Sequence, residues 1–239
     1  MLTDISTVIW KEWKEFLGQR STLLSMLFFL AVFAGLLPLQ AGERWVDSPL
    51  SVANLIFVPL FFVLTVIADS FAGERERHTL DTLLASRLTD RAILFGKLTA
   101  AVSYGWGLTM VALLLALVPA GLKAGRVVAY PPATLLGAEF LSLFAIVLVS
   151  GGGILVSLRA ATVRQAQQTL NVGLLAVGVV AIVGFALLPE AWRESLHEAV
   201  FAASTAQLLL AAGALLLAAD VVLIALAVAR FRRSRLVLD

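Results

Sequence analysis

The sequence predicts an all-α integral membrane protein with six transmembrane helices, and three observations lead to this prediction. Of the 239 residues, 60% are hydrophobic and 14% are charged, whereas soluble domains have about 45–50% apolar and about 25% charged residues. Six apolar windows are each close to the ~20 residues that a helix needs to cross a bilayer. The windows are continuously apolar and lack the alternation of barrel strands, so each is expected to pair its backbone groups as a helix.

The predicted spans lie in one transmembrane domain that covers residues 1–239. They are residues 22–39, 50–68, 93–120, 134–158, 169–188 and 207–229. The longest polar stretch between spans is residues 69–90, and no linker is long enough to separate two domains. No internal repeat supports an inverted-repeat transporter.

Residues 1–20, ahead of the first span, are predicted to form an interfacial amphipathic helix. Its apolar stripe consists of Ile5, Val8, Ile9, Trp13, Phe16 and Leu17. Its polar face includes Lys11, Glu12, Lys14 and Glu15. The segment is too charged to span, so we expect it to lie flat in the cytoplasmic interface with its stripe in lipid. A plain anchor and a docking role both remain open.

Residues 69–90 are predicted to contain a short amphipathic helix between the second and third spans. Gly73 is expected to end the preceding helix, and Arg77 and Asp81 are spaced for a mildly stabilising i, i+4 pair. Thr89 or Asp90 can cap the next helix. One face carries Leu80, Leu83, Leu84 and Leu88. These leucines can lie on lipid, pack on the chain's own bundle, or insert into a partner's groove.

The distribution of basic residues predicts the orientation. Of the 18 Lys and Arg residues, 14 lie before the first span, after the second, after the fourth, or in the C-terminal tail. By the positive-inside rule these segments face the cytoplasm, so both termini should be cytoplasmic in the inner (plasma) membrane. An even number of spans requires the same.

Polar side chains within the spans are candidates for a substrate path. Asp220 lies near the middle of the last span, where a carboxylate costs about 2.5–3.5 kcal/mol on insertion scales. It is either a substrate or ion contact, or a structural hydrogen-bonding or protonated group. Asn54 and Asn171 are weaker candidates that could simply hold helices together.

The segment from Glu74 to Lys97 resembles the signature of type 2 ATP-binding cassette (ABC) transporter permeases. The matching residues are Glu74, Arg75, Glu76, Arg77, Thr79, Leu80, Asp81, Leu83, Leu84, Arg91, Ile93, Gly96 and Lys97. Two positions depart from the pattern, because His78 stands where glycine is usual and Leu88 where proline is common. The interfacial helix, the six spans and the glycine-containing segment 151–168 are similar to the layout of that family along nearly the whole chain.

The resemblance implies that residues 69–90 contain a coupling helix that docks on a separate ATP-hydrolysing subunit. The residues that it implies for docking are Glu74, Arg75, Glu76, Arg77, Thr79, Leu80, Asp81, Leu83 and Leu84. It implies the permease subunit of an exporter, with two copies of the permease, expected as a homodimer, and two copies of the ATPase. ATP and Mg would then be bound by the partner, with no cofactor in this chain.

The sequence itself favours no enzyme. It has no cysteine, and its two histidines, His78 and His197, lack the spacing of a metal site. No glycine-rich phosphate-binding loop is present, so we expect neither catalytic residues nor ATP binding by that route. Nucleic-acid binding is not expected either. Two other functions stay open: a membrane scaffold without transport, and an ion-gradient-driven transporter that uses Asp220.

Overall fold

The structure is a computed structural model that describes residues 1–231, except for the side chains of residues 47, 49–53, 56, 58, 199–202, 205 and 206. The secondary structure of the described residues is helical. The main helices are α1 (Leu2–Gly18), α2 (Arg20–Leu30), α3 (Leu37–Ala41), α5 (Pro49–Glu76), α6 (Leu80–Ala85), α7 (Asp90–Ala124), α8 (Pro132–Ser157), α9 (Val163–Ala186), α10 (Glu190–Ala202) and α11 (Thr205–Arg230). The all-α prediction is therefore confirmed.

Five helices among the described residues are long and apolar enough to cross a membrane. They are Arg20–Ala41, Asp90–Ala124, Pro132–Ser157, Val163–Ala186 and Gln207–Arg230. Helix α5 covers the remaining predicted span, residues 50–68, but several of its side chains lie outside the described part. A count of six spans therefore stays a prediction, and so does the topology signal expected from Arg232, Arg233 and Arg235, which lie beyond the described residues.

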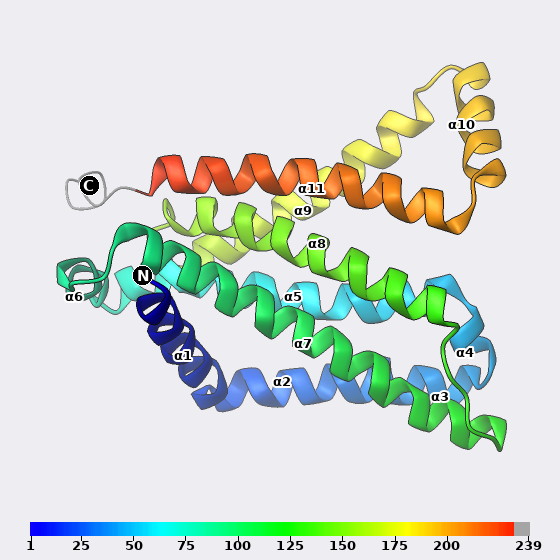
Figure 1. The fold of residues 1–239 in the computed structure, drawn as a ribbon, viewed down its shortest axis with the longest axis horizontal. Helices are drawn as coiled ribbons and strands as arrows, with labels where there is room; N and C mark the ends of the chain where they lie inside the picture. The colour runs from blue at the N-terminus through cyan, green and yellow to red at the C-terminus, as the bar shows by residue number, and fades with distance from the viewer. Residues whose placement is uncertain (232–239) are drawn as a thin grey trace.

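The long helices run roughly along one direction and leave the N-terminus and the end of α11 at the same end of the bundle (Figure 1). The N-terminus, α6 and the end of α11 lie at this end, which we call the α6 end. Helices α3 and α10 and the short α4 (Arg44–Asp47) lie at the opposite end. This placement agrees with an even number of crossings.

The first span is one nearly continuous helix that contains an irregular turn. Between α2 and α3, residues Ala31–Leu36 form a π-helical segment. Pro38 follows directly, and a proline has no backbone N–H and its ring crowds the carbonyl group four residues earlier. The wider π turn accommodates this loss within the helix. The span is thus preserved despite its proline.

The centre of the bundle is formed by α5, α7 and α8, which pack closely on one another. A Cβ atom on Gly153 of α8 would lie 2.3 Å from a methyl carbon of Ile67 in α5. Nearby, Ser157 is fully buried, and its hydroxyl donates to the Ala68 carbonyl at 2.9 Å and accepts from the Phe71 and Ala72 amides. Gly153 therefore allows α8 to approach α5 closely.

Helices α9 and α11 lie at the periphery. Helix α11 packs mainly on α8, and α9 packs on α5 and α8. Most side chains of α9 from Asn171 onward are exposed, among them Leu175, Val180 and Ile182. Exposed apolar side chains over such a length are expected where lipid or another membrane protein covers the helix.

Candidate functional site

The candidate site is built at the α6 end, where the second span continues well beyond its predicted limit. Helix α5 passes through Gly73 and ends at Glu76, so the prediction that Gly73 ends it is wrong. A Cβ on Gly73 would lie 1.9 Å from an Asp69 carboxylate oxygen. Glycine here leaves room for Asp69 to pair with Arg77, at 2.9 Å. The predicted Arg77–Asp81 pair is also wrong, because Arg77 lies in the turn after α5, whereas Asp81 belongs to α6.

This turn has the hydrogen bonds of a Schellman motif. The Thr79 amide donates to the Glu74 carbonyl at 2.8 Å, and the His78 amide donates to the Arg75 carbonyl at 3.0 Å. His78 has φ of 57°, and it is the one non-glycine residue with positive φ among the described residues. The left-handed conformation costs a side-chain-bearing residue roughly 1–2 kcal/mol. His78 therefore adopts the left-handed conformation that glycine would adopt without strain.

Replacing His78 by glycine should raise the free energy of unfolding by about 1 kcal/mol, because glycine adopts positive φ without strain. Thermal unfolding of the purified protein in detergent measures the change. Gly125 is the matched control: its φ is 68° and a Cβ there would meet nothing within 4 Å, so Gly125→Ala should destabilise by a similar amount. Equal stability of wild type and His78→Gly would contradict the assignment of strain to this turn.

Two lysines and two glutamates form a buried charge cluster between α1, α5 and α7. Lys97 of α7 is 2% exposed, and its ammonium group lies 2.7 Å from Glu12 Oε1 and 3.1 Å from Glu74 Oε1. It also donates to the Ser70 carbonyl at 2.7 Å, so its three N–H donors all have acceptors. Lys11 of α1 lies 2.7 Å from the same Glu74 oxygen. We call Lys11, Glu12, Glu74 and Lys97 the charge cluster.

The environment of the cluster keeps its outer cations charged. Burial lowers the pKa of Lys11, but the hydrogen bond and charge of Glu74, together with Glu12 and Glu15, outweigh burial and raise the pKa above its ordinary value. The pKa of Arg77 is also raised: burial lowers it, and the hydrogen bond and charge of Asp69 more than compensate. Ionised partners of this kind form strong, short hydrogen bonds.

Helix α1 packs along α7, and this overturns the expectation that its whole apolar stripe lies in lipid. Val8 and Phe16 are buried, and the Trp13 indole donates to the Ser103 hydroxyl at 3.1 Å. Glu12, expected on the polar face, is 3% exposed. The physical reason is that Lys97 provides α1 with a buried partner for Glu12, so the helix docks on protein. Trp10 and Leu17 remain exposed and can still contact a membrane surface.

Gly96 is the closest contact of this docking. A Cβ on Gly96 would lie 2.6 Å from two carbon atoms of the Val8 side chain. Gly96→Ala should therefore lower the free energy of unfolding by about 1–3 kcal/mol, the usual cost of overpacking. Gly107, in the same helix α7, has nothing within 4 Å of its Cβ position. The control Gly107→Ala should be neutral or stabilising by about 0.5–1 kcal/mol.

Chemical denaturation of both variants measures these effects, and limited proteolysis after residue 18 reports whether α1 has been released. Similar stability of Gly96→Ala and Gly107→Ala would show that the contact between α1 and α7 is loose.

Two further charged residues connect the end of α5 to the junction between α8 and α9. The Arg75 guanidinium donates to the carbonyl groups of Leu158, at 2.9 Å, and Ala160. A Glu76 carboxylate oxygen accepts from the Val163 amide at the first turn of α9, at 3.0 Å. A carboxylate at that position also interacts favourably with the dipole of α9. The end of α5 is therefore joined by hydrogen bonds to the end of α8 and to the first turn of α9.

Helix α6 presents its leucines to the chain itself. Leu80 and Leu84 are buried in the main core, and Leu83 and Leu88 pack against that core. Of the three arrangements left open by the sequence, these leucines adopt packing on their own bundle. The outward face of α6 consists of Asp81, Thr82 and Ala85, which are exposed. Thr89 caps α7 by accepting from the Ala92 amide, as one of the two predicted capping residues.

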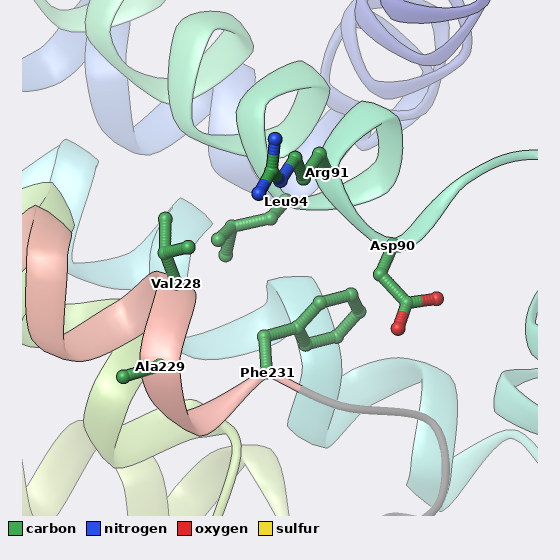
Figure 2. A pocket seen from close by; sticks show the side chains of 6 residues that line it. All are labelled: Asp90, Arg91, Leu94, Val228, Ala229 and Phe231. Atoms are coloured by element: carbon green, nitrogen blue, oxygen red, sulfur yellow. The ribbon is translucent and has the colours of Figure 1, made fainter.

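Arg91 lies apart from the charge cluster. It lines a pocket of about 270 Å³ between the start of α7 and the end of α11. Figure 2 shows Arg91 and Leu94 on the α7 side of this pocket and Phe231 on the opposite side. The Phe231 ring packs on Phe71 of α5, with the ring centroids 5.2 Å apart. The residues that carry the family resemblance therefore lie at two different sites. Gly96 and Lys97 lie at the contact between α7 and α1, and Arg91 lies at the pocket between α7 and α11.

The three candidate residues of the substrate path have different surroundings. Asp220 is 3% exposed, and neither of its carboxylate oxygens has a hydrogen-bond partner among the described residues. Asn54 and Asn171 are exposed. Asp220 lies in α11, which packs on α8, whereas Asn54 belongs to α5 and Asn171 to α9. Among the described residues, no group of three or more His, Asp or Glu side chains is arranged to hold a metal ion.

Comparison with known proteins gives one result. A model of the family described as "ABC-2 type transporter" matches residues 3–215, which is most of the chain. No curated protein matches the chain.

Proposed function

The chain belongs to the ABC-2 type transporter family and is a permease subunit of an ABC transporter, and we propose that it couples ATP hydrolysis on a separate subunit to export of a substrate. The observation that carries the proposal is the set of contacts that joins the helices at the α6 end. The charge cluster, the turn at His78 and the buried leucines of α6 hold α1, α5, α6 and α7 together. A force applied to α6 would therefore reach the spans.

In this proposal the ATPase docks on the outward face of α6 and on the exposed parts of the turn before it. Asp81, Thr82, Arg77 and Thr79 are exposed there. Leu80 and Leu84 are buried, so they support the docking surface from within and make no direct contact with the partner. Arg75 and Glu76 would pass the motion on to α8 and α9.

The complete transporter would contain two permeases and two ATPases, with ATP and Mg bound by the ATPases. Two copies of this chain, as a homodimer, would enclose the substrate path between them. The α6 end would face the cytoplasm of the inner membrane, because basic residues concentrate in the segments at this end. Closure of the ATPase pair would move both α6 helices and change the path between the permeases.

A charge on the outward face of α6 should uncouple the transporter without unfolding it. Ala85→Arg alters an exposed residue, whereas Leu83 packs on the core and Glu76 bonds to Val163, so changes there would also disturb the chain itself. We expect insertion and thermal stability to be unchanged and stimulation of the ATPase to fall about tenfold or more, since an unmatched interfacial charge costs over 1.4 kcal/mol.

The matched control is Val127→Arg, at an exposed residue of the loop at the opposite end. The measurements are ATPase activity of the reconstituted complex and thermal unfolding of the permease. Full stimulation in Ala85→Arg would refute docking through α6.

The buried, unpartnered Asp220 favours a second candidate, transport driven by an ion gradient. Transport that follows a proton gradient without nucleotide and is lost in Asp220→Asn would establish it. A scaffold without transport would instead behave identically with and without ATP. Co-purification with a soluble ATPase supports the ABC mechanism over both.

A further inference from the structure

A pocket of about 370 Å³ opens between α1 and α6, beside the charge cluster. Its walls include Lys11 and Glu15 of α1, Glu74 and Arg77 at the end of α5, and Thr82 and Leu83 of α6. The volume is many times the ~30 Å³ share of one water molecule, so it can hold a long side chain. Thr82, an exposed residue on the outward face of α6, is one of the residues that line it.

Glu74 lines this pocket, and one of its carboxylate oxygens has no hydrogen-bond partner among the described residues. Lys11 and Lys97 both bind Glu74 Oε1, at 2.7 and 3.1 Å. Glu74 Oε2 is buried and accepts no hydrogen bond in the described part of the chain. A buried carboxylate oxygen without a donor is costly, because it has lost its water and gained nothing in return. The described residues supply no donor for it, and a donor from a partner protein can complete it.

The ion pairs around the pocket leave an excess of negative charge. Three cations, Lys11, Arg77 and Lys97, are joined by direct ion pairs to four carboxylates. The four are Glu12, Glu15, Asp69 and Glu74. The group therefore carries a formal charge of −1, so the missing donor should be a single positive charge. No metal-binding group of acidic or histidine side chains is present among the described residues.

We propose that this pocket receives one basic side chain, an Arg or Lys, of the ATP-hydrolysing subunit, and that its N–H group donates to Glu74 Oε2. The proposal rests on the proposed function and adds the chemistry of docking to it. A long, thin cationic side chain matches the pocket in length, charge and hydrogen bonding. It would make Glu74 the point where the partner's charge joins the charge cluster.

The test compares Glu74→Gln with Glu12→Gln in the full-length protein, using the ATPase that co-purifies with the wild-type chain. Both substitutions remove a carboxylate from the charge cluster and deprive the same two lysines of a partner. Of these two glutamates, Glu74 lines the pocket and Glu12 does not. We expect Glu74→Gln to weaken ATPase binding about tenfold relative to Glu12→Gln, and to reduce its dependence on salt, while both variants lose similar thermal stability.

A second experiment leaves this chain's fold unaltered. A photoreactive residue at Thr82 identifies the ATPase segment beside the pocket, and its basic residue is neutralised in the ATPase alone. We expect about a tenfold loss of affinity, with no further loss when Glu74→Gln is added. Additive losses, or a cross-linked segment without Arg or Lys, would overturn the proposal.

Three outcomes separate the inference from the proposed function. A wild-type chain that binds no ATPase refutes the function itself. Binding that is equal in Glu74→Gln and Glu12→Gln refutes only the basic side chain. A third outcome is that Glu74→Gln leaves ATPase binding unchanged but abolishes the dependence of transporter activity on phosphatidylethanolamine in vesicles. This result would show that a lipid amine occupies the pocket, and it would also refute the inference.

Discussion

Replacing Lys97 by methionine should lower the free energy of unfolding by about 3–5 kcal/mol, which is the usual cost of leaving a buried charge without its partner. The Lys97 side chain is 1% exposed and binds both Glu12 and Glu74, whose side chains are 4% and 3% exposed. Methionine keeps much of the length and apolar surface of lysine, so the loss arises mainly from two buried carboxylates that keep only the half-buried Lys11 as a cationic partner. Equilibrium unfolding in mixed detergent micelles measures the change.

Two comparisons isolate this effect. Lys14→Met removes the same charge at an exposed position of α1, and a change within about 0.5 kcal/mol is expected. Adding Glu12→Gln to Lys97→Met should restore part of the loss, because one of the two buried carboxylates is then neutral. A loss under 1 kcal/mol in Lys97→Met would mean that Lys11, which already contacts both carboxylates, is a sufficient partner for them.

Replacing Asp220 by leucine should stabilise the permease by about 2–3 kcal/mol. Both carboxylate oxygens of Asp220 are buried and have no hydrogen-bond partner in the described residues. A carboxyl group in that position contributes little to folding, whereas leucine is well suited to a span. If Asp220 serves the transport cycle, the stabilised variant should transport less, as expected where function retains an unfavourable residue.

The matched control is Asp69→Asn, which removes a carboxylate that is paired with Arg77 and should destabilise instead. Transport of the reconstituted variants is measured in parallel with unfolding. A destabilised Asp220→Leu would show that Asp220 hydrogen-bonds another helix or a second copy, which is the structural role.

Much of the fold follows from the sequence because lipid imposes a simple rule on it. Continuous apolar windows of about 20 residues can only be helices, and five of the six predicted windows are recognised as candidate spans. The windows gave only approximate ends, since α5 extends eight residues past residue 68. Helix ends outside the hydrocarbon depend on local capping, as at His78, which apolar windows do not record.

The charge cluster could not be predicted from the sequence, although the sequence analysis names all four of its residues. Lys11 and Glu74 are 63 residues apart, and Glu12 and Lys97 are 85 apart. A helical pattern relates only residues three or four positions apart, so it assigned Glu12 to the polar face of α1. One signal was available: Lys97 lies within an apolar window, where a charge needs a partner. The sequence does not name that partner, because docking of α1 on α7 decides it.

The 85-residue separation between Glu12 and Lys97 also determines when α1 can settle. Synthesis at roughly 5–20 residues per second leaves some 4–17 seconds between the two residues. During that interval Val8 and Phe16 have no α7 to cover them, so α1 floats on the bilayer surface as an amphipathic helix. It leaves that surface when Lys97 emerges and neutralises Glu12. The contact between α1 and α7 can therefore form only after the start of the third predicted span has been synthesised.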